Sequence, residues 1–270
     1  MIQLSQISET FESLWPASGA EPWDAPGFVT SHSDALTGVL LTVDVTGPVL
    51  AEARAKGCNL VVAHHPFLLK GTQDVNHDSL KGSVLSFAIK NSIAIFAAHT
   101  NADIVEDGVS DAIAKKLGLT DISPLVATTE SVGHGRIGRL AHPMQLQKFA
   151  ALVAEVMPFS ARGVVVAGDP DQVISTVALC GGAGDSFIDA AIASQADVYV
   201  TSDLRHHPTL DATLTPREKA LALVDVSHWA AESLWLESAA RSIKNAHEGV
   251  PVHVSEVVTD PWVFSINRGE

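Results

Sequence analysis

Residues 38–66 read GVLLTVDVTGPVLAEARAKGCNLVVAHHP, and this stretch determines the expected fold class. Residues 38–46 and 59–63 are short apolar runs rich in Val, Leu and Thr, which is typical of buried strands. Between them, Pro48 stands in the first turn of an expected helix, where proline is tolerated, and Gly57 ends that helix. The stretch therefore predicts a strand–helix–strand unit, the building block of a parallel sheet.

The same alternation of strands and helices continues on both sides of this unit. Apolar residues at helical spacing from Leu4 to Leu14 predict an opening helix that Pro16 ends. Residues 123–144 are rich in turn residues, so we expect a domain boundary with an edge strand there. The remaining expected helices are 83–91, 109–117, 145–156, 186–194 and 227–245, and the remaining expected strands are 92–98, 163–166, 174–180, 197–201, 220–226 and 250–257. This order predicts two α/β units.

Composition excludes several classes of protein. The 270 residues include 31 acidic and 17 basic side chains, a net charge of −14, so a generic nucleic-acid-binding role is not expected. Two cysteines are too few for a disulfide framework and favour a reducing compartment. No apolar run approaches the ~18 residues that span a bilayer, and the first residues lack the basic region of a signal peptide. We expect a soluble cytoplasmic protein with no membrane partner.

Twelve histidines stand beside a single tyrosine, and two of them, His64 and His65, directly follow the expected strand 59–63. In open α/β sheets, ligands bind outside the carboxyl ends of the strands. Neighbours in an extended chain point in opposite directions, so the pair suits two nearby metals, or one metal and a substrate. A surface loop with two solvated histidines is the alternative.

Two further pairs occupy equivalent places. His99 and Asp103 follow the expected strand 92–98, although Asp103 could equally cap a helix. His228 and Glu232 lie four apart on an expected helix and share one face, as metal ligands or as an ordinary polar pair. Together these positions supply enough imidazoles and carboxylates for a two-metal site, which can activate water and clamp a phosphoryl or amide oxygen.

Two weaker features lie in the second half of the chain. CGGAG at 180–184 separates an expected strand from a helix, where backbone N–H groups could receive an anion, or where the chain makes a tight turn. Arg205, within SDLRHH, could meet a substrate phosphate, and an ordinary salt bridge is the alternative.

The ordered segments VVAHHP, HTNAD, CGGAG and DVSHWAAE, with Gly108 and Asp111 between the second and third, resemble the Nif-three-like dinuclear metal centre family. Its members are often named GTP cyclohydrolase 1 type 2 homologues. WDAPGF near the N-terminus also resembles a segment of this family, although Ala25 and Pro26 depart from its pattern. Ser202 and His206 are further departures, and they concern substrate-facing positions rather than the expected ligands.

The resemblance implies an α/β fold with two α/β domains that contain mixed sheets. The second domain would be inserted into the first, and a dinuclear metal site would lie in the cleft between them. We expect the first domain over 1–124 and 220–270 and the second over 125–219. The resemblance also implies a homohexamer and two divalent metal ions per chain, such as Zn, Fe or Mn. The implied metal ligands are His64, His65, Asp103, His228 and Glu232, and the implied catalytic residues are His99 and His207.

The implied function is that of a dinuclear-metal-dependent hydrolase that acts on a nucleotide or a related small molecule. A phosphoesterase or an amidohydrolase fits the same residues. The alternative is a non-catalytic metal-binding scaffold or metal chaperone that acts through an oligomeric surface.

Overall fold

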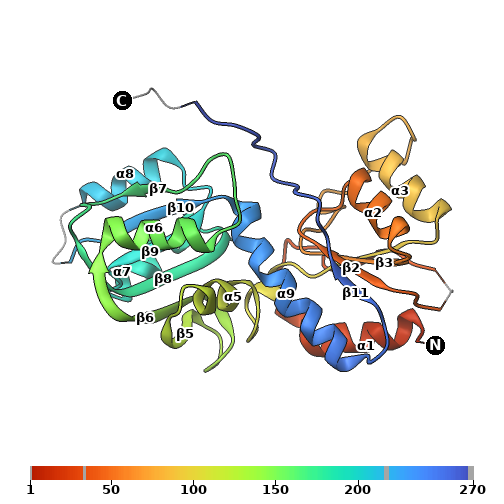
Figure 1. Cartoon of the computed structure of the whole chain (residues 1–270), viewed down its shortest axis with the longest axis horizontal. Helices are drawn as coiled ribbons and strands as arrows, with labels where there is room; N and C mark the ends of the chain where they lie inside the picture. Colours follow the sequence, from red (N-terminus) through yellow and green to blue (C-terminus); the bar gives the residue numbers. More distant parts are fainter. Residues whose placement is uncertain (1, 33–34, 216–218, 267–270) are drawn as a thin grey trace. The chain divides into compact units, whose positions relative to one another are not determined.

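The computed structural model describes residues 2–32, 35–215 and 219–266, and its fold is α/β with two mixed sheets (Figure 1). The chain divides into two compact units. Unit 1 comprises Met1–Val105 and Leu236–Thr259, and unit 2 comprises Glu106–Trp235 and Asp260–Glu270. Each unit contains one of the two sheets.

The sheet of unit 1 has the strand order β1-β4-β3-β2-β11. Strands β4, β3, β2 and β11 run parallel to one another, and β1 pairs with β4 in the antiparallel direction. The parallel core agrees with the alternation of strands and helices in the sequence. The strands are β1 (Gly27–Thr30), β2 (Val39–Thr42), β3 (Leu60–Ala63), β4 (Ala94–Ala97) and β11 (Val252–Val254).

Helices cover both faces of this sheet. Helices α2 (Gly47–Ala55) and α3 (Leu80–Lys90) share one apolar cluster with alternate residues of β2, β3 and β4. On the other face, α1 (Leu4–Leu14) packs the ring of Phe11 against Phe96 of β4, with ring centroids 4.5 Å apart. Burial on both faces explains why these strands are continuous apolar runs.

The sheet of unit 2 has the strand order β5-β6-β8-β9-β10-β7. Strands β8, β9 and β10 are parallel, whereas β5, β6 and β7 join in antiparallel pairs. Strand β7 therefore forms an edge of the sheet. The strands are β5 (Thr120–Ala127), β6 (Gly133–Gln145), β7 (Val165–Ala167), β8 (Val173–Ala183), β9 (Val198–Ser202) and β10 (Ala222–Val226).

The helices of unit 2 begin and end mostly where the sequence predicts. Residues of α7 and α8 share an apolar cluster with Tyr199 of β9 and Leu223 of β10, and α6 contacts β6 and β8. Both cysteines, Cys58 and Cys180, are buried thiols. Within the described residues, no helix has the length and apolar composition needed to cross a bilayer. The helices are α5 (Val109–Lys116), α6 (Leu146–Val156), α7 (Ile188–Ala193), α8 (His206–Leu214) and α9 (His228–Ala246), whose last part belongs to unit 1.

The turn-rich segment 123–144 differs most from its expected structure, because most of it forms the long strands β5 and β6. Its glycines lie in β6, close to atoms of the neighbouring strand. A Cβ atom on Gly133 would lie 2.2 Å from the carbonyl oxygen of Val126, and one on Gly138 would lie 2.9 Å from that of Thr120. Close backbone approach, rather than a turn, requires glycine here.

Among the strands and α-helices of the described residues, three short elements were not expected: β1, α4 (Thr100–Asp103) and α8. The domain boundaries also differ from those expected. Strand β10 and most of β5 fall in the expected first domain, but both pair within the sheet of unit 2. Local periodicity identifies a strand without its partner, so it does not assign the strand to a sheet.

Candidate metal centre

The carboxyl ends of the parallel strands in unit 1 bring several polar side chains together. After β3 ends at Ala63, the backbone N–H of His64 still donates to Thr42 of β2 at 3.0 Å. His99 follows the neighbouring strand β4, which pairs in parallel with β3. The sheet thus places histidines from two strands at one edge, as expected for a ligand site in an α/β fold.

Three imidazoles form one group at this edge. One ligand atom from each of His64, His65 and His99 lies within 4.8 Å of the others. The rings of His64 and His65 are 5.1 Å apart, so these neighbours do not diverge as an extended chain would predict. Extended structure ends at Ala63, and the bend that follows lets both rings reach the same place. Such a group could hold a metal ion.

Each of these histidines is oriented through its Nδ1 atom. Nδ1 of His64 lies 2.9 Å from the carbonyl oxygen of Ala98. In the two other histidines a carboxylate is the partner: His65 contacts Asp44 at 2.7 Å, and His99 contacts Asp24 at 2.7 Å. An Nδ1–H that donates to oxygen leaves the basic lone pair on Nε2, the arrangement that orients histidine ligands in metal sites.

Asp24 connects His99 to the segment before β1. Its Oδ2 atom accepts a hydrogen bond from the backbone N–H of Thr100 at 3.1 Å and another from the Thr100 hydroxyl. Burial raises the pKa of Asp24, but these bonds and His99 outweigh it and hold the pKa below its usual value. Burial and the neighbouring His64 lower the pKa of His99, despite Asp24. The lowered pKa favours the neutral form of the His99 imidazole.

Asp103 joins the same group through the one-turn helix α4. This helix begins directly after His99, and its turn carries Asp103 back toward the imidazoles. Oδ1 of Asp103 lies 3.6 Å from Nε2 of His64. Unit 1 thus brings together His64, His65, His99 and Asp103, all of which were expected near a metal site.

Unit 2 carries a second group at the start of α9. Nε2 of His228 lies 2.7 Å from Oε1 of Glu232, one helical turn further on, and Nδ1 lies 2.7 Å from Oδ2 of Asp203. Burial lowers the pKa of His228, but the two carboxylates outweigh it and raise the pKa to about 11. A site with this negative charge favours a cation, and a divalent ion could take the place of the proton.

Gly182, within the CGGAG segment, explains how the backbone approaches this second group. Its φ angle is +70°, and a Cβ atom there would lie 2.9 Å from Oε1 of Glu232 and 3.5 Å from Nε2 of His228. Glycine is thus required both by the left-handed backbone and by the space beside the two ligand atoms. Residues 180–183 are the last part of β8, so close approach of this strand to the two side chains is a role that neither interpretation of CGGAG included.

Two residues singled out in the sequence lie outside these groups. His207 is exposed on α8, and its ring stands 5.1 Å from that of His206. Arg205 forms an ion pair with Asp185, and its side chain is 75% exposed, which supports the salt-bridge interpretation. The catalytic role expected for His207 stays a prediction.

The sequence interpretation missed the three carboxylates that orient histidines: Asp24, Asp44 and Asp203. Asp24 lies in the WDAPGF segment, and Asp44 and Asp203 each follow a strand. These positions are typical of residues in a ligand site of an α/β fold. Their partners are 75, 21 and 25 residues away along the chain. Only the folded chain shows which carboxylate meets which histidine.

Comparison with known proteins agrees with these motifs. The model of the family described as Duf34/NIF3 (NGG1p interacting factor 3) matches residues 2–261. The chain belongs to the Duf34/NIF3 family. The resemblance noted in the sequence is thereby confirmed.

Individual relatives of this Duf34/NIF3 chain match over nearly their whole length. A Streptomyces coelicolor protein named "GTP cyclohydrolase 1 type 2 homolog" is 42% identical, over 98% of this chain and 95% of its own. A Clostridium acetobutylicum protein of the same name is 29% identical, over 97% of this chain and 99% of its own. The crystal structure of a Bacillus cereus protein related to NIF3 has a TM-score of 0.90 at 24% identity, over 97% of this chain and 99% of its own, and supports the fold.

Proposed function

We propose that this Duf34/NIF3 protein is a metal-dependent hydrolase with a dinuclear centre, acting on a nucleotide or a related small molecule. The proposed ligands of two divalent ions, such as Zn, Fe or Mn, are His64, His65, Asp103, His228 and Glu232. The name shared by its relatives, GTP cyclohydrolase 1 type 2 homolog, suggests a purine nucleotide as the first substrate to test.

One observation carries this proposal: histidines in both groups are oriented by a carboxylate at Nδ1. Asp44 orients His65 at 2.7 Å, and Asp203 orients His228 at 2.7 Å. A solvated surface histidine needs no such partner, whereas a metal ligand gains affinity from it. The donor set of imidazoles and carboxylates suits divalent zinc, iron or manganese.

We assign the metal ligands and two further histidines different roles in hydrolysis. Bound divalent ions would supply Lewis acidity toward water and toward a carbonyl or phosphoryl oxygen. His99, whose lowered pKa favours the neutral imidazole and whose ring is held by Asp24, would accept a proton at Nε2. His207, exposed on α8, is proposed as the second proton carrier.

The metal proposal is tested by elemental analysis of purified protein. We expect about two divalent ions per chain, and a clear loss in the His65→Ala variant. His142→Ala is the matched control, because His142 is exposed on β6 and lies outside both groups. Equal metal content in wild type and His65→Ala would contradict the proposed ligands.

The hydrolase proposal needs a separate assay. Metal-loaded protein should turn over GTP or a member of a panel of phosphoesters and amides, and Glu232→Gln should abolish that turnover. Glu237→Gln is the control, because Glu237 is exposed on the same helix. If both ions bind but no substrate is turned over, the metal-binding scaffold or chaperone becomes the better interpretation.

We also propose that the protein is a cytoplasmic homo-oligomer, a hexamer by resemblance. Two buried thiols suit a reducing compartment. Light scattering after size-exclusion chromatography should give six copies of the 28.4-kDa chain, and fractionation should recover the protein with cytoplasmic markers.

A further inference from the structure

The segment after β11 presents a run of large apolar side chains to solvent. Residues 261–266 read PWVFSI and contain no charged residue. Trp262 is 65% exposed and Phe264 is 72% exposed, and Val263 and Ile266 are exposed further still. Single exposed apolar residues are ordinary, but a contiguous group marks an interaction surface. We call residues 261–266 the apolar arm.

The apolar arm begins at a fixed point in unit 2. Oδ2 of Asp260 accepts a hydrogen bond from the hydroxyl of Ser227 at 2.6 Å, and Oδ1 accepts one from the backbone N–H of Trp262 at 3.0 Å. Ser227 directly follows β10, so the arm starts at the carboxyl end of that strand. Six extended residues reach up to ~20 Å from this anchor.

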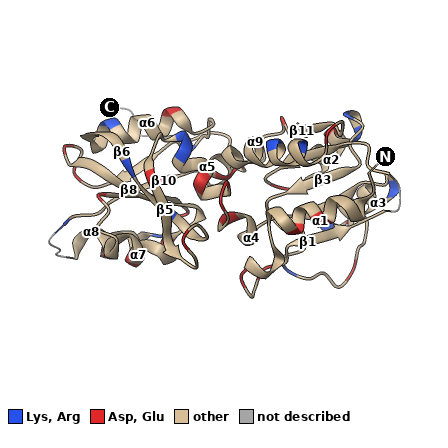
Figure 2. Cartoon of the chain, turned by 90° about the horizontal axis from the view of Figure 1, so that it is seen from below, with Lys and Arg blue, Asp and Glu red and all other residues tan. Residues whose placement is uncertain are grey.

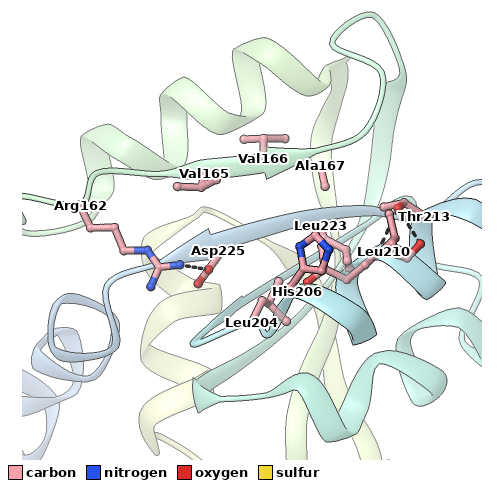
Figure 3. A pocket seen from close by; sticks show the side chains of 11 residues that line it. Arg162, Val165, Val166, Ala167, Leu204, His206, Leu210, Thr213, Leu223 and Asp225 are labelled. Carbon is pink, nitrogen blue, oxygen red and sulfur yellow. Dashed lines mark hydrogen bonds and ion pairs between the residues drawn. The ribbon is translucent and has the colours of Figure 1, made fainter. Parts of the chain in front are cut away.

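Unit 2 also has an apolar pocket of about 360 Å³ (Figure 3). Val165 and Ala167 of the edge strand β7 line one side, and Leu223 of β10 and Leu210 of α8 line the other. Val165 is 52% exposed and Leu210 is 39% exposed, so among the described residues these walls are only partly covered. A pocket of this size is large enough to receive aromatic side chains.

One end of the pocket is polar. Arg162 forms an ion pair there with Asp225 of β10 (Figure 3). The Asp225 side chain is 8% exposed, and its Oδ2 atom is the partner of Arg162. Apart from His206, Thr209 and Thr213, the remaining lining residues are apolar, which suits an uncharged apolar segment.

We propose that the apolar arm of one copy of the chain binds in this pocket of a second copy. Within one copy, the arm and the pocket both expose apolar surface, although both belong to unit 2. Exchange of identical segments between copies covers both surfaces at once and produces closed symmetric assemblies. The inference rests on the proposed self-association and is independent of the metal centre.

Charge favours an uncharged contact between copies. The chain carries a net charge of −14, and acidic positions occur in both units (Figure 2). Two such chains repel each other wherever acidic surfaces meet. Contact through the uncharged arm and the valine and leucine walls of the pocket brings no like charges together.

The area of the contact indicates a reciprocal exchange. Two aromatic side chains such as Trp262 and Phe264 remove roughly 300–500 Å² from water when buried. A stable interface buries about 1,200–2,000 Å² in total. One arm alone is insufficient, so two copies must each insert an arm into the other, with neighbouring surfaces adding to the contact.

The test is the molar mass of the full chain over a range of concentrations, measured by light scattering after size-exclusion chromatography. The double variant Trp262→Asp/Phe264→Asp and the pocket variant Val165→Glu should both show a smaller assembly than wild type, with association weakened at least tenfold. Ile89→Asp is the control, because Ile89 is 66% exposed on α3 and belongs to neither surface. Circular dichroism and metal content should match wild type in all variants.

The outcomes separate this inference from self-association in general. A wild type that stays monomeric at every concentration contradicts both proposals. An oligomeric wild type with an unchanged arm variant contradicts the role of the arm alone. An effect of the arm variant without an effect of Val165→Glu shows that the arm binds elsewhere and overturns the assignment of the pocket. Mixing the arm variant with the pocket variant should restore part of the association, because one arm–pocket contact is then intact.

Discussion

Asp44 accepts a hydrogen bond from Nδ1 of His65 at 2.7 Å, and this contact makes Nε2 the basic nitrogen of that ring. The hydroxyl of Thr259 donates to the other oxygen of Asp44 at 2.6 Å, so the carboxylate is itself held in place. A bond from Asp203 orients His228 in the same way in unit 2. In each unit, one histidine is thus oriented by a carboxylate at Nδ1, an arrangement that is typical of metal ligands.

Replacement of Asp44 by Asn should therefore weaken metal binding without unfolding the protein. Loss of the charge and of one of the two acceptor oxygens should reduce affinity by about 10–100-fold. Competition with a chelator of known affinity measures this change. Asp189→Asn, at an exposed position on α7, should leave the affinity unchanged, and equal affinities of both variants would contradict a role for Asp44 in the site.

Substitution of Gly182 by Ala tests the space beside His228 and Glu232. The new Cβ atom would lie 2.9 Å from Oε1 of Glu232 on a backbone with φ +70°, so metal content should fall and stability should drop by more than about 1 kcal/mol. Gly57→Ala is a matched control, because Gly57 has φ +72° and no atom within 4 Å of its Cβ position. The control should lose stability but keep its metal. Normal metal content in the Gly182→Ala protein would contradict the close contact expected between the new Cβ atom and the Glu232 carboxylate.

The buried ion pair between Asp111 and Arg136 should make unit 2 sensitive to the loss of either partner. The Asp111 and Arg136 side chains are 7% and 2% exposed, and Arg136 also donates to the carbonyl oxygens of Gly133 and Gly135 at 2.7 Å. Asp111→Ala leaves a buried guanidinium without its carboxylate and should cost about 3–5 kcal/mol in urea unfolding. The double variant Asp111→Leu/Arg136→Met should recover part of that loss. A single variant within about 0.5 kcal/mol of wild type would show that the pair is dispensable.

Asp197 predicts a specific pH dependence of stability. Its carboxylate accepts from the backbone N–H groups of Ser175 and Thr176 at 2.9 and 2.7 Å and pairs with Lys219 at 2.8 Å. Burial raises the pKa of Asp197, but these partners outweigh it and hold the pKa below its usual value. A carboxylate with a lowered folded pKa stabilises the protein above the unfolded pKa, and the gain is lost as pH falls through the folded pKa.

Asp197→Asn should accordingly lose about 1–3 kcal/mol at pH 7. The difference from wild type should shrink steadily below about pH 4, the usual value of an aspartate. Urea unfolding at pH 7, 4 and 3 measures the difference. A difference that does not change across this range would show that the charge of Asp197 has no part in stability.

The sequence predicted the elements around the candidate site well and the second sheet less well. His64, His65 and Asp103 were identified because they follow apolar strands, and His228 and Glu232 because helical spacing places them on one face. Residues 123–144 were misjudged because glycines that look like turn residues lie where neighbouring strands leave no space for a Cβ atom. Strand β10 was assigned to the other domain because its pattern says nothing about its partners.

Local pattern and motif order in this chain were sufficient for the α/β fold class, the family and the residue types that could hold a metal. Periodicity and strand-end position are properties of short segments, so the sequence alone displays them. Only the tertiary structure showed that Asp24 meets His99 across 75 residues and that Asp203 meets His228 across 25. These contacts depend on which strands are neighbours in a sheet, and strand order is set by the packing of the whole unit rather than by any one segment.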